Sequence, residues 1–220
     1  AHLRQWADAG VQACAMEASS IGIAEHRLDG THIRVAVFTN FTQDHLDYHS
    51  SMAAYWQAKA ALFDWPGLQA AVINIDDAQG AALAQTLRHR DGLALWTFSL
   101  TQAQADRLHH LQAQAIRQGP HGLAFDVCEN TDAGEQRVAL NTALIGRYNV
   151  SNVLGVIAVL RAMGHSLQDA ARACATLPSV PGRMQMIQAA AHAVQPCVVV
   201  DYAHTPDAVA QALQALRALA

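Results

Sequence analysis

Residues 35–63 read VAVFTNFTQDHLDYHSSMAAYWQAKAALF, and this segment indicates how the rest of the chain is arranged. An apolar, β-branched run, Val35–Phe38, leads directly into polar side chains, and a helical run from Met52 to Phe63 follows. A buried strand that opens into polar residues and then a helix is typical of a parallel α/β sheet. Ligands of such sheets bind at the carboxyl ends of the strands. We therefore expect a binding site just after Phe38.

Lys59 is the lysine of this helical run, and almost all of its neighbours are apolar. No acidic residue lies three or four positions away to pair with it, whereas surface helix lysines usually have polar neighbours. One interpretation is a lysine that extends its amine into solvent from a half-buried helix. The other is a lysine held at an apolar site, where desolvation makes the amine nucleophilic.

The same alternation of strand and helix continues along the chain. Apolar runs at 70–75 and 93–98 predict two more strands, with an amphipathic helix at 78–88 between them. This pattern predicts an α/β fold with a three-layer, mostly parallel sheet. From the residues alone, Asp76 and Asp77 at the end of the 70–75 run could be a metal pair. From 107 to 141 the residues alternate around Gly119–Gly122, which predicts a small antiparallel sheet added to the parallel one.

Further elements are predicted towards both ends of the chain. A short helix at 3–9 and an apolar strand at 11–16 are predicted upstream, and Glu17 follows that strand directly. We expect Glu17 to line the other side of the binding site that is expected after Phe38. Near the other end, a buried strand at 198–200 and a helix that begins at Pro206 are predicted. An almost wholly apolar helix at 153–163 is expected to be buried on all sides.

Composition narrows the classes of function. The 220 residues are 52% hydrophobic and 15% charged, with a formal net charge of −4, so neither disorder nor a nucleic-acid partner is expected. No apolar run reaches the roughly 20 residues that span a bilayer, and no signal-peptide pattern is present, so a cytoplasmic protein without a membrane partner is expected. The scattered Cys14, Cys128, Cys174 and Cys197 predict buried free thiols.

Five ordered motifs, covering essentially the whole chain, resemble the Mur ligase family. They are MEASSIG at 16–22, TNFTQDHLDYH at 39–49 with Lys59 following, GRYNVSN at 146–152, PGRM at 181–184 and DYAHTPD at 201–207. The closest resemblance is to members that add the third residue to the UDP-linked muramoyl peptide. It implies the central α/β domain of that family, followed by the start of a Rossmann-like C-terminal domain. It also places Asp76 and Asp77 at the entry to a helix, so no chemistry is assigned to them.

The resemblance implies a metal site and catalytic roles. Glu17, His45 and Lys59 would hold magnesium, and His45 and Lys59 would be the catalytic residues. Lys59 would first react with carbon dioxide to give N6-carboxylysine, which turns a cation into an oxygen-donor anion. Mg²⁺ prefers oxygen ligands, so the role of His45 depends on the family precedent. His49 could share a helical face with His45, but an exposed or capping histidine is the preferred interpretation.

The resemblance also implies binding roles. Substrate contacts fall on Ser19, Glu25 and Arg27, although Ile21 stands where the family usually has histidine and Glu25 stands near a family glutamine. The residues implied in nucleotide contact are Asn149 and Asn152 at the adenine, Arg183 near the nucleotide, Asp201 at the ribose and His204 near the phosphates. From the residues alone, Asn149 and Asn152 would be helix-capping side chains.

The implied reaction is the ATP-dependent addition of a diamino acid to UDP-MurNAc-L-Ala-D-Glu through an acyl phosphate. Meso-diaminopimelate rather than lysine is expected as the amino acid that is added. The protein is expected to be a monomer. No phosphate-loop motif occurs, so residues 1–181 are expected to be the central domain without that loop and 182–220 the beginning of the C-terminal domain, inactive as a fragment. The alternatives are another Mur ligase, a folylpolyglutamate synthetase, or a non-catalytic nucleotide-binding module.

Overall fold

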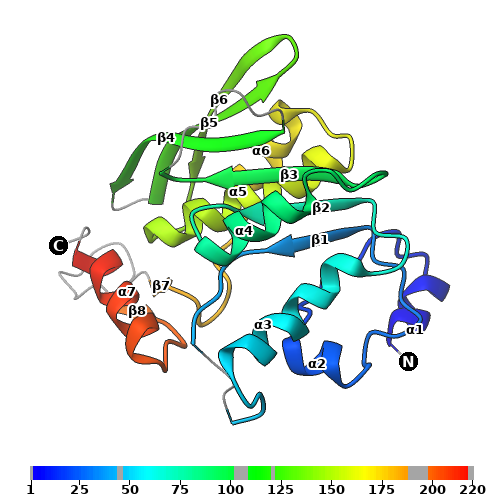
Figure 1. The fold of residues 1–220 in the computed structure, drawn as a ribbon. Helices are drawn as coiled ribbons and strands as arrows, with labels where there is room; N and C mark the ends of the chain where they lie inside the picture. The colour runs from blue at the N-terminus through cyan, green and yellow to red at the C-terminus, as the bar shows by residue number, and fades with distance from the viewer. Residues whose placement is uncertain (1, 44–46, 102–108, 120–121, 188–197, 218–220) are drawn as a thin grey trace. The chain divides into compact units, whose positions relative to one another are not determined.

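The computed structural model describes residues 2–43, 47–101, 109–119, 122–187 and 198–217 (Figure 1). The chain divides into two compact units, and each is described by itself. The first unit comprises residues 1–33 and 43–66, and the second comprises residues 34–42 and 67–220. The domain boundary predicted between residues 181 and 182 falls inside the second unit and stays a prediction.

The second unit is built on a six-stranded sheet with the strands in chain order. They are β1 (Val35–Phe38), β2 (Ala70–Asn74), β3 (Ala94–Ser99), β4 (His110–Gly119), β5 (Gly122–Thr131) and β6 (Gly134–Thr142). Strands β1 to β4 pair in parallel, and β4 to β6 pair antiparallel. The predicted parallel sheet with an antiparallel addition is therefore confirmed, and the two parts form one continuous sheet.

Helices cover both faces of the parallel strands: α4 (Ala78–Leu87) on one, and α5 (Arg147–Ala162) on the other (Figure 1). The register places Phe38 on the same face as Thr97, so Phe98 points to the opposite face. A Cβ added at Gly80 in α4 would lie 2.7 Å from the Phe38 ring, and one added at Gly155 in α5 would lie 3.3 Å from the Phe98 ring. The predicted three-layer arrangement is confirmed.

Helix α5 supplies one side of the hydrophobic core. Its buried side chains recur at helical spacing and are Val150, Val153, Leu154, Ile157 and Ala158. They pack in one cluster with buried residues of the strands, among them Val72, Phe98, Leu111 and Val127. The expectation that this helix is buried on all sides is wrong, because Val156 is 42% exposed. A helix that packs on one face of a sheet buries only a stripe.

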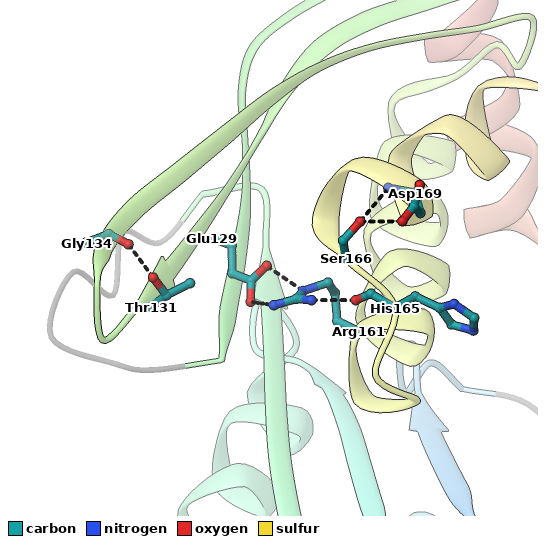
Figure 2. Close-up of polar contacts among 7 residues, drawn as sticks. All are labelled: Glu129, Thr131, Gly134, Arg161, His165, Ser166 and Asp169. Carbon is teal, nitrogen blue, oxygen red and sulfur yellow. Dashed lines mark hydrogen bonds and ion pairs between the residues drawn. The ribbon is translucent and has the colours of Figure 1, made fainter.

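A buried ion pair joins α5 to β5. The Nε and Nη2 groups of Arg161 donate to the two carboxylate oxygens of Glu129 at 2.7 and 2.8 Å (Figure 2). The Nη1 group of Arg161 donates to the carbonyl of His165, and its guanidinium lies 5.6 Å from the centroid of the Trp96 ring. Glu129 is only 1% exposed. The bidentate geometry therefore neutralises a carboxylate that water scarcely reaches.

The next helix, α6 (Leu167–Ala175), begins at a side-chain cap. The Ser166 hydroxyl accepts a hydrogen bond from the Asp169 amide at 3.1 Å and donates to the Asp169 carboxylate at 2.6 Å (Figure 2). The second unit also contains a two-stranded antiparallel sheet, β7 (Gln185–Ile187) with β8 (Val198–Val200), and α7 (Pro206–Arg217). The predicted strand at 198–200 forms, but it is not buried, since Val198 is 48% exposed. Two strands alone bury little side-chain surface.

The described part of the first unit contains helices and no strand. They are α1 (His2–Asp8), α2 (Ser20–Ala24), α3 (Met52–Ala60) and the 3₁₀ helix η1 (Ala61–Asp64). The predicted strand at 11–16 is wrong: these residues have no regular secondary structure and are exposed. An extended segment forms a strand only by hydrogen bonding to another strand, and the described part of this unit offers none. Glu17 therefore does not follow a strand.

Three of the four cysteines lie within the described residues. Cys128 and Cys174 are buried free thiols, as predicted, whereas Cys14 is exposed and Cys197 lies outside the described residues. Burial raises the pKa of the Cys174 thiol to about 11. Within the described ranges, no helix is both long enough and apolar enough to cross a membrane.

Removing the charge of Arg161 should cost much of the stability. We expect Arg161→Leu to lower the free energy of unfolding by about 3–5 kcal/mol, because the Glu129 carboxylate would stay buried without a counter-charge. The matched control is Arg172→Leu, which breaks an exposed 3.1 Å ion pair with Asp169 and should cost less than about 1 kcal/mol. Urea denaturation at pH 7 measures both. Equal losses for the two variants would contradict this account of the ion pair.

Candidate functional site

The predicted substrate residues of the first unit lie at the two ends of α2. Ser19 is the N-cap, and its hydroxyl accepts a hydrogen bond from the Gly22 amide at 3.0 Å. A Cβ added at Gly22 would lie 2.9 Å from that hydroxyl oxygen, so glycine lets the cap form. Glu25 and Arg27 follow the helix and are exposed.

Tyr48 lies against Glu25, one of the predicted substrate residues. The Tyr48 hydroxyl donates a hydrogen bond to the Glu25 carboxylate. This bond is the main reason why the pKa of Tyr48 lies above its ordinary value of 10, because ionisation would break it. Desolvation and the negative charge of Glu25 raise the pKa further, and the positive charge of Arg27 lowers it. The structure thus pairs the predicted Glu25 with a tyrosine that was not assigned a role from sequence.

His49 lies inside the first unit. It is 6% exposed, and its Nε2 atom lies 2.9 Å from the Ser20 hydroxyl oxygen, which is also buried. Its ring stacks on that of Tyr55, with the centroids 5.2 Å apart and the planes 29° apart. The interpretation of His49 as an exposed or capping histidine is therefore wrong. Its partners are 29 and 6 residues away in the chain, beyond the reach of a local pattern.

Lys59 lies in the last turn of α3 and is half-buried. Its amine lies 5.0 Å from the centroid of the Tyr55 ring. A protonated amine at this distance from a ring face is attracted by the ring quadrupole. The apolar setting that the sequence predicts for this lysine is thus partly an aromatic one.

The structure leaves the predicted metal set untested. His45 lies outside the described residues, and Glu17 is exposed in a segment without regular secondary structure. In the part of the chain that the structure describes, no three His, Cys, Asp or Glu side chains are grouped to hold a metal ion. Nor does the Glu17 carboxylate have a hydrogen bond or ion pair with a described residue, so its oxygens, the ligand type that Mg²⁺ prefers, are available.

In the second unit, the segment after β1 is held by residues at the end of β2. The Asn74 side-chain amide donates to the Thr39 carbonyl at 2.7 Å, and the Phe41 amide donates to the Asp77 carboxylate at 2.8 Å. The other Asp77 oxygen caps α4 by accepting from the amides of residues 79 and 80. Asp76 accepts a hydrogen bond from the Leu100 amide at 2.6 Å. The interpretation of this acidic pair as a helix entry is confirmed for Asp77.

The two predicted adenine contacts lie in the first turns of α5. The Asn149 side-chain amide donates to the Ile145 carbonyl at 2.7 Å, and the Asn152 side-chain amide donates to the Asn149 side-chain oxygen at 3.1 Å. Gly146, the N-cap, donates its amide to the Gln118 side chain at 3.1 Å. These bonds fix the start of the helix to the residues before it and to β4. Asn152 itself is exposed.

Two segments distant in the sequence meet at Asp201. Its carboxylate oxygens accept hydrogen bonds from the amides of Met184 and Ala203, both at 2.8 Å. Burial raises the pKa of Tyr148 to about 12, the charge of Asp201 contributes in the same direction, and the charge of Arg183 lowers it. The charges of predicted Asp201 and Arg183 therefore both act on Tyr148, a neighbour of Asn149.

Tyr202 lies beside Arg183 and His204, the other two residues of this region with a predicted nucleotide contact. The Arg183 guanidinium lies 5.4 Å from the centroid of the Tyr202 ring. The exposed His204 has its Nδ1 atom 2.9 Å from the Tyr202 carbonyl oxygen, and the two rings meet edge to face with their centroids 5.1 Å apart. Tyr202 is itself 67% exposed, so this part of the cluster is open to solvent.

Comparisons with known proteins agree with the motifs. Residues 1–160 match the sequence model of the Mur ligase middle domain. The chain is 60% identical over 216 residues to the UDP-N-acetylmuramoyl-L-alanyl-D-glutamate--2,6-diaminopimelate ligase of Acidovorax sp. (strain JS42), a match that covers 98% of this chain and 40% of that protein. A protein of the same name from Janthinobacterium sp. (strain Marseille) is 49% identical over 212 residues, with 96% and 40% covered.

A solved structure supports the same relationship. It is a structure of a UDP-N-acetylmuramoyl-L-alanyl-D-glutamate--2,6-diaminopimelate ligase, and it aligns with a TM-score of 0.80 at 34% identity. The alignment covers 99% of this chain and 42% of that chain. The chain thus spans about two-fifths of the length of the relatives named here.

The cluster around Asp201 can be tested through Tyr148. We expect Asp201→Asn to lower the pKa of Tyr148 from about 12, because a negative charge is removed, but to leave it above 10 because burial remains. Arg183→Gln should raise the pKa of Tyr148 above its value in the unmodified protein, because a positive charge is removed. Titration of ¹³C-labelled tyrosine by NMR measures both changes, and Asp169→Asn on the exposed surface of α6 is the control. An unchanged Tyr148 titration in Asp201→Asn would contradict the cluster.

Proposed function

The chain belongs to the Mur ligase family, and from that premise we propose that it supplies the central part of an ATP-dependent ligase that adds meso-diaminopimelate to UDP-MurNAc-L-Ala-D-Glu. The observation that carries the proposal is the 60% identity with the Acidovorax ligase over 98% of this chain. All five motifs fall within the chain. A cytoplasmic location is part of the proposal, because the reaction consumes ATP.

The chemistry explains why ATP is needed. A carboxylate is a poor electrophile, since its leaving group would be oxide. In the first step the glutamate side-chain carboxylate of the substrate attacks the γ-phosphorus of ATP, which forms an acyl phosphate and releases ADP. In the second step the amine of the diamino acid attacks the acyl carbon, an amide bond forms, phosphate leaves and the amine loses a proton. The protein contributes mainly position and electrostatics.

In the first unit, the proposal assigns substrate binding to Ser19, Glu25 and Arg27. The Arg27 guanidinium suits a carboxylate or phosphate because it donates two parallel hydrogen bonds. Glu25 accepts a hydrogen bond from Tyr48, which limits the orientations of its carboxylate. Ser19 caps α2 through one lone pair and still has its hydroxyl proton to donate.

The described part of the same unit carries two of the three residues assigned to magnesium, Glu17 and Lys59. Glu17, His45 and Lys59 would hold it, and the bound metal would neutralise the phosphate charge as the phosphoryl group moves. Lys59 cannot be a ligand as a protonated amine. Its neutral amine must first attack the carbon of carbon dioxide, forming an N–C bond and releasing a proton, so that a carbamate presents oxygen atoms.

In the second unit, the proposal assigns nucleotide binding to Asn149, Asn152, Arg183, Asp201 and His204. The Asp201 carboxylate accepts two backbone hydrogen bonds, and a carboxylate has about four lone-pair sites, so it can also accept from ribose hydroxyls. The exposed Asn152 uses its amide group on Asn149, which leaves its carbonyl oxygen to accept from an adenine amino group. These internal bonds hold the side chains in place for binding.

The test of the function is phosphate release by the full-length protein that contains this chain. We expect release only when UDP-MurNAc-L-Ala-D-Glu, ATP, Mg²⁺ and meso-diaminopimelate are all present. Lys59→Ala and Lys59→Arg should each reduce the rate on the order of 100-fold, the loss expected when a charge-stabilising group is removed. Added bicarbonate should stimulate the unmodified protein and neither variant.

The matched control is Gln57→Ala, an exposed position on the same helix, which should keep the rate within about twofold. ATP binding without any amino-acid-dependent phosphate release would contradict the ligase and support a non-catalytic nucleotide-binding module. A rate with lysine that exceeds the rate with meso-diaminopimelate would contradict the amino acid proposed.

A further inference from the structure

We propose that His49 is a positioning residue of the ligase site, and that it sets the geometry of Lys59 and of the segment that carries Ser19. The inference rests on the proposed function and extends it to a residue that neither reacts nor binds metal in that proposal. One buried imidazole contacts Ser20 next to Ser19, Tyr55 on the helix that carries Lys59, and its own chain neighbour Tyr48, whose hydroxyl donates to Glu25.

The first contact is with the start of α2. The His49 Nε2 atom and the Ser20 hydroxyl oxygen are 2.9 Å apart, and both residues are buried, at 6% and 1% exposure. Water cannot readily replace either partner, so each depends on the other for its hydrogen bond. Because Ser20 is the residue after Ser19, this bond fixes the backbone from which the Ser19 hydroxyl projects.

The second contact leads to Lys59. The His49 ring stacks on Tyr55, which is 4% exposed, and the Lys59 amine lies 5.0 Å from the centroid of the Tyr55 ring. A ring packed on a second ring has little freedom to tilt. The position of the Tyr55 ring face, and with it the position of the Lys59 amine, therefore depends on His49.

The third contact is with Tyr48, the residue before His49, and Tyr48 in turn contacts Glu25. The Tyr48 ring meets the His49 ring edge to face, with the centroids 4.9 Å apart and the planes 79° apart. The Tyr48 hydroxyl in turn donates to the Glu25 carboxylate. A substitution at His49 should therefore disturb the positions of the substrate residues and of Lys59 together. Substitution of a buried residue that only stabilises the fold should not do so.

A second buried histidine provides a control of the same chemistry. In the sheet of the second unit, His110 and Thr97 are 2% and 1% exposed, and the His110 Nδ1 atom lies 2.9 Å from the Thr97 hydroxyl oxygen. This pair joins β3 to β4. Neither residue has a role in the proposed reaction. Substitution of His110 therefore reports what the loss of a buried histidine–hydroxyl bond does to stability alone.

The experiment compares His49→Gln with His110→Phe in the full-length protein. Four quantities are measured: the melting temperature, kcat, KM for ATP, and the ¹³C NMR signal of carbamate formed from ¹³C-bicarbonate. The part of that signal due to Lys59 is defined as the part that Lys59→Arg removes. Glutamine can place a polar atom near Ser20 but removes the ring that stacks on Tyr55.

We expect His49→Gln to lower the Lys59 carbamate signal and kcat together by about three- to tenfold, the ratio that corresponds to the loss of an aromatic pair. KM for ATP should change less than about twofold. His110→Phe should lower the melting temperature but, below it, keep the carbamate signal and kcat within about twofold of the unmodified protein. Tyr55→Leu should reproduce the His49→Gln result and Tyr55→Phe should not, which decides the matter if His49→Gln does not fold.

The outcomes separate the two proposals. If the unmodified protein has neither ligase activity nor a Lys59 carbamate, the proposed function fails and the role of His49 fails with it. If the unmodified protein has both, and His49→Gln and Tyr55→Leu keep them at the level of His110→Phe, the function stands and the positioning role of His49 is overturned.

Discussion

Helix α5 packs along one face of the sheet, and the geometry of the second unit depends on that contact. The helix lies against β1 to β5, and its buried stripe is part of the main hydrophobic cluster. The Arg161–Glu129 ion pair fixes its C-terminal half, and the Asn149 bond to the Ile145 carbonyl fixes its start. Two of the proposed nucleotide-contact residues, Asn149 and Asn152, therefore lie on an element anchored by the core, and such anchoring favours a precise site.

The first unit holds its side chains by a different means. It is small and, in its described part, helical, and buried polar and aromatic side chains do much of the positioning. The imidazole of His49 has a hydrogen bond to Ser20 and packs against two tyrosine rings. A buried polar group without a partner would cost about 1–3 kcal/mol, so such an arrangement has few alternatives. The site should therefore be sensitive to substitution of His49.

The sequence predicts those parts of the fold that short-range patterns determine. Strand β2, buried along its whole length, and helix α4 follow from periodicity. The apolar segment at 11–16 shows the limit, because a strand needs a partner that periodicity does not supply. The hydrogen bond between His49 and Ser20, and the bond from the Met184 amide to Asp201, join residues that are far apart in the chain. The motifs identify candidate residues, but only tertiary structure shows what holds them.

The central claim is that Glu17 and a carboxylated Lys59 hold a metal ion in a ligase of this family. A crystal structure of the full-length protein with ADP, bicarbonate and Mn²⁺ in place of Mg²⁺ tests it most directly, because the anomalous signal locates Mn²⁺ independently of the protein. The account predicts a Mn²⁺ ion in direct contact with the Glu17 carboxylate and with carbamate oxygens on Lys59. Mn²⁺ bound by neither residue, with Lys59 still an unmodified amine over the Tyr55 ring, would contradict it.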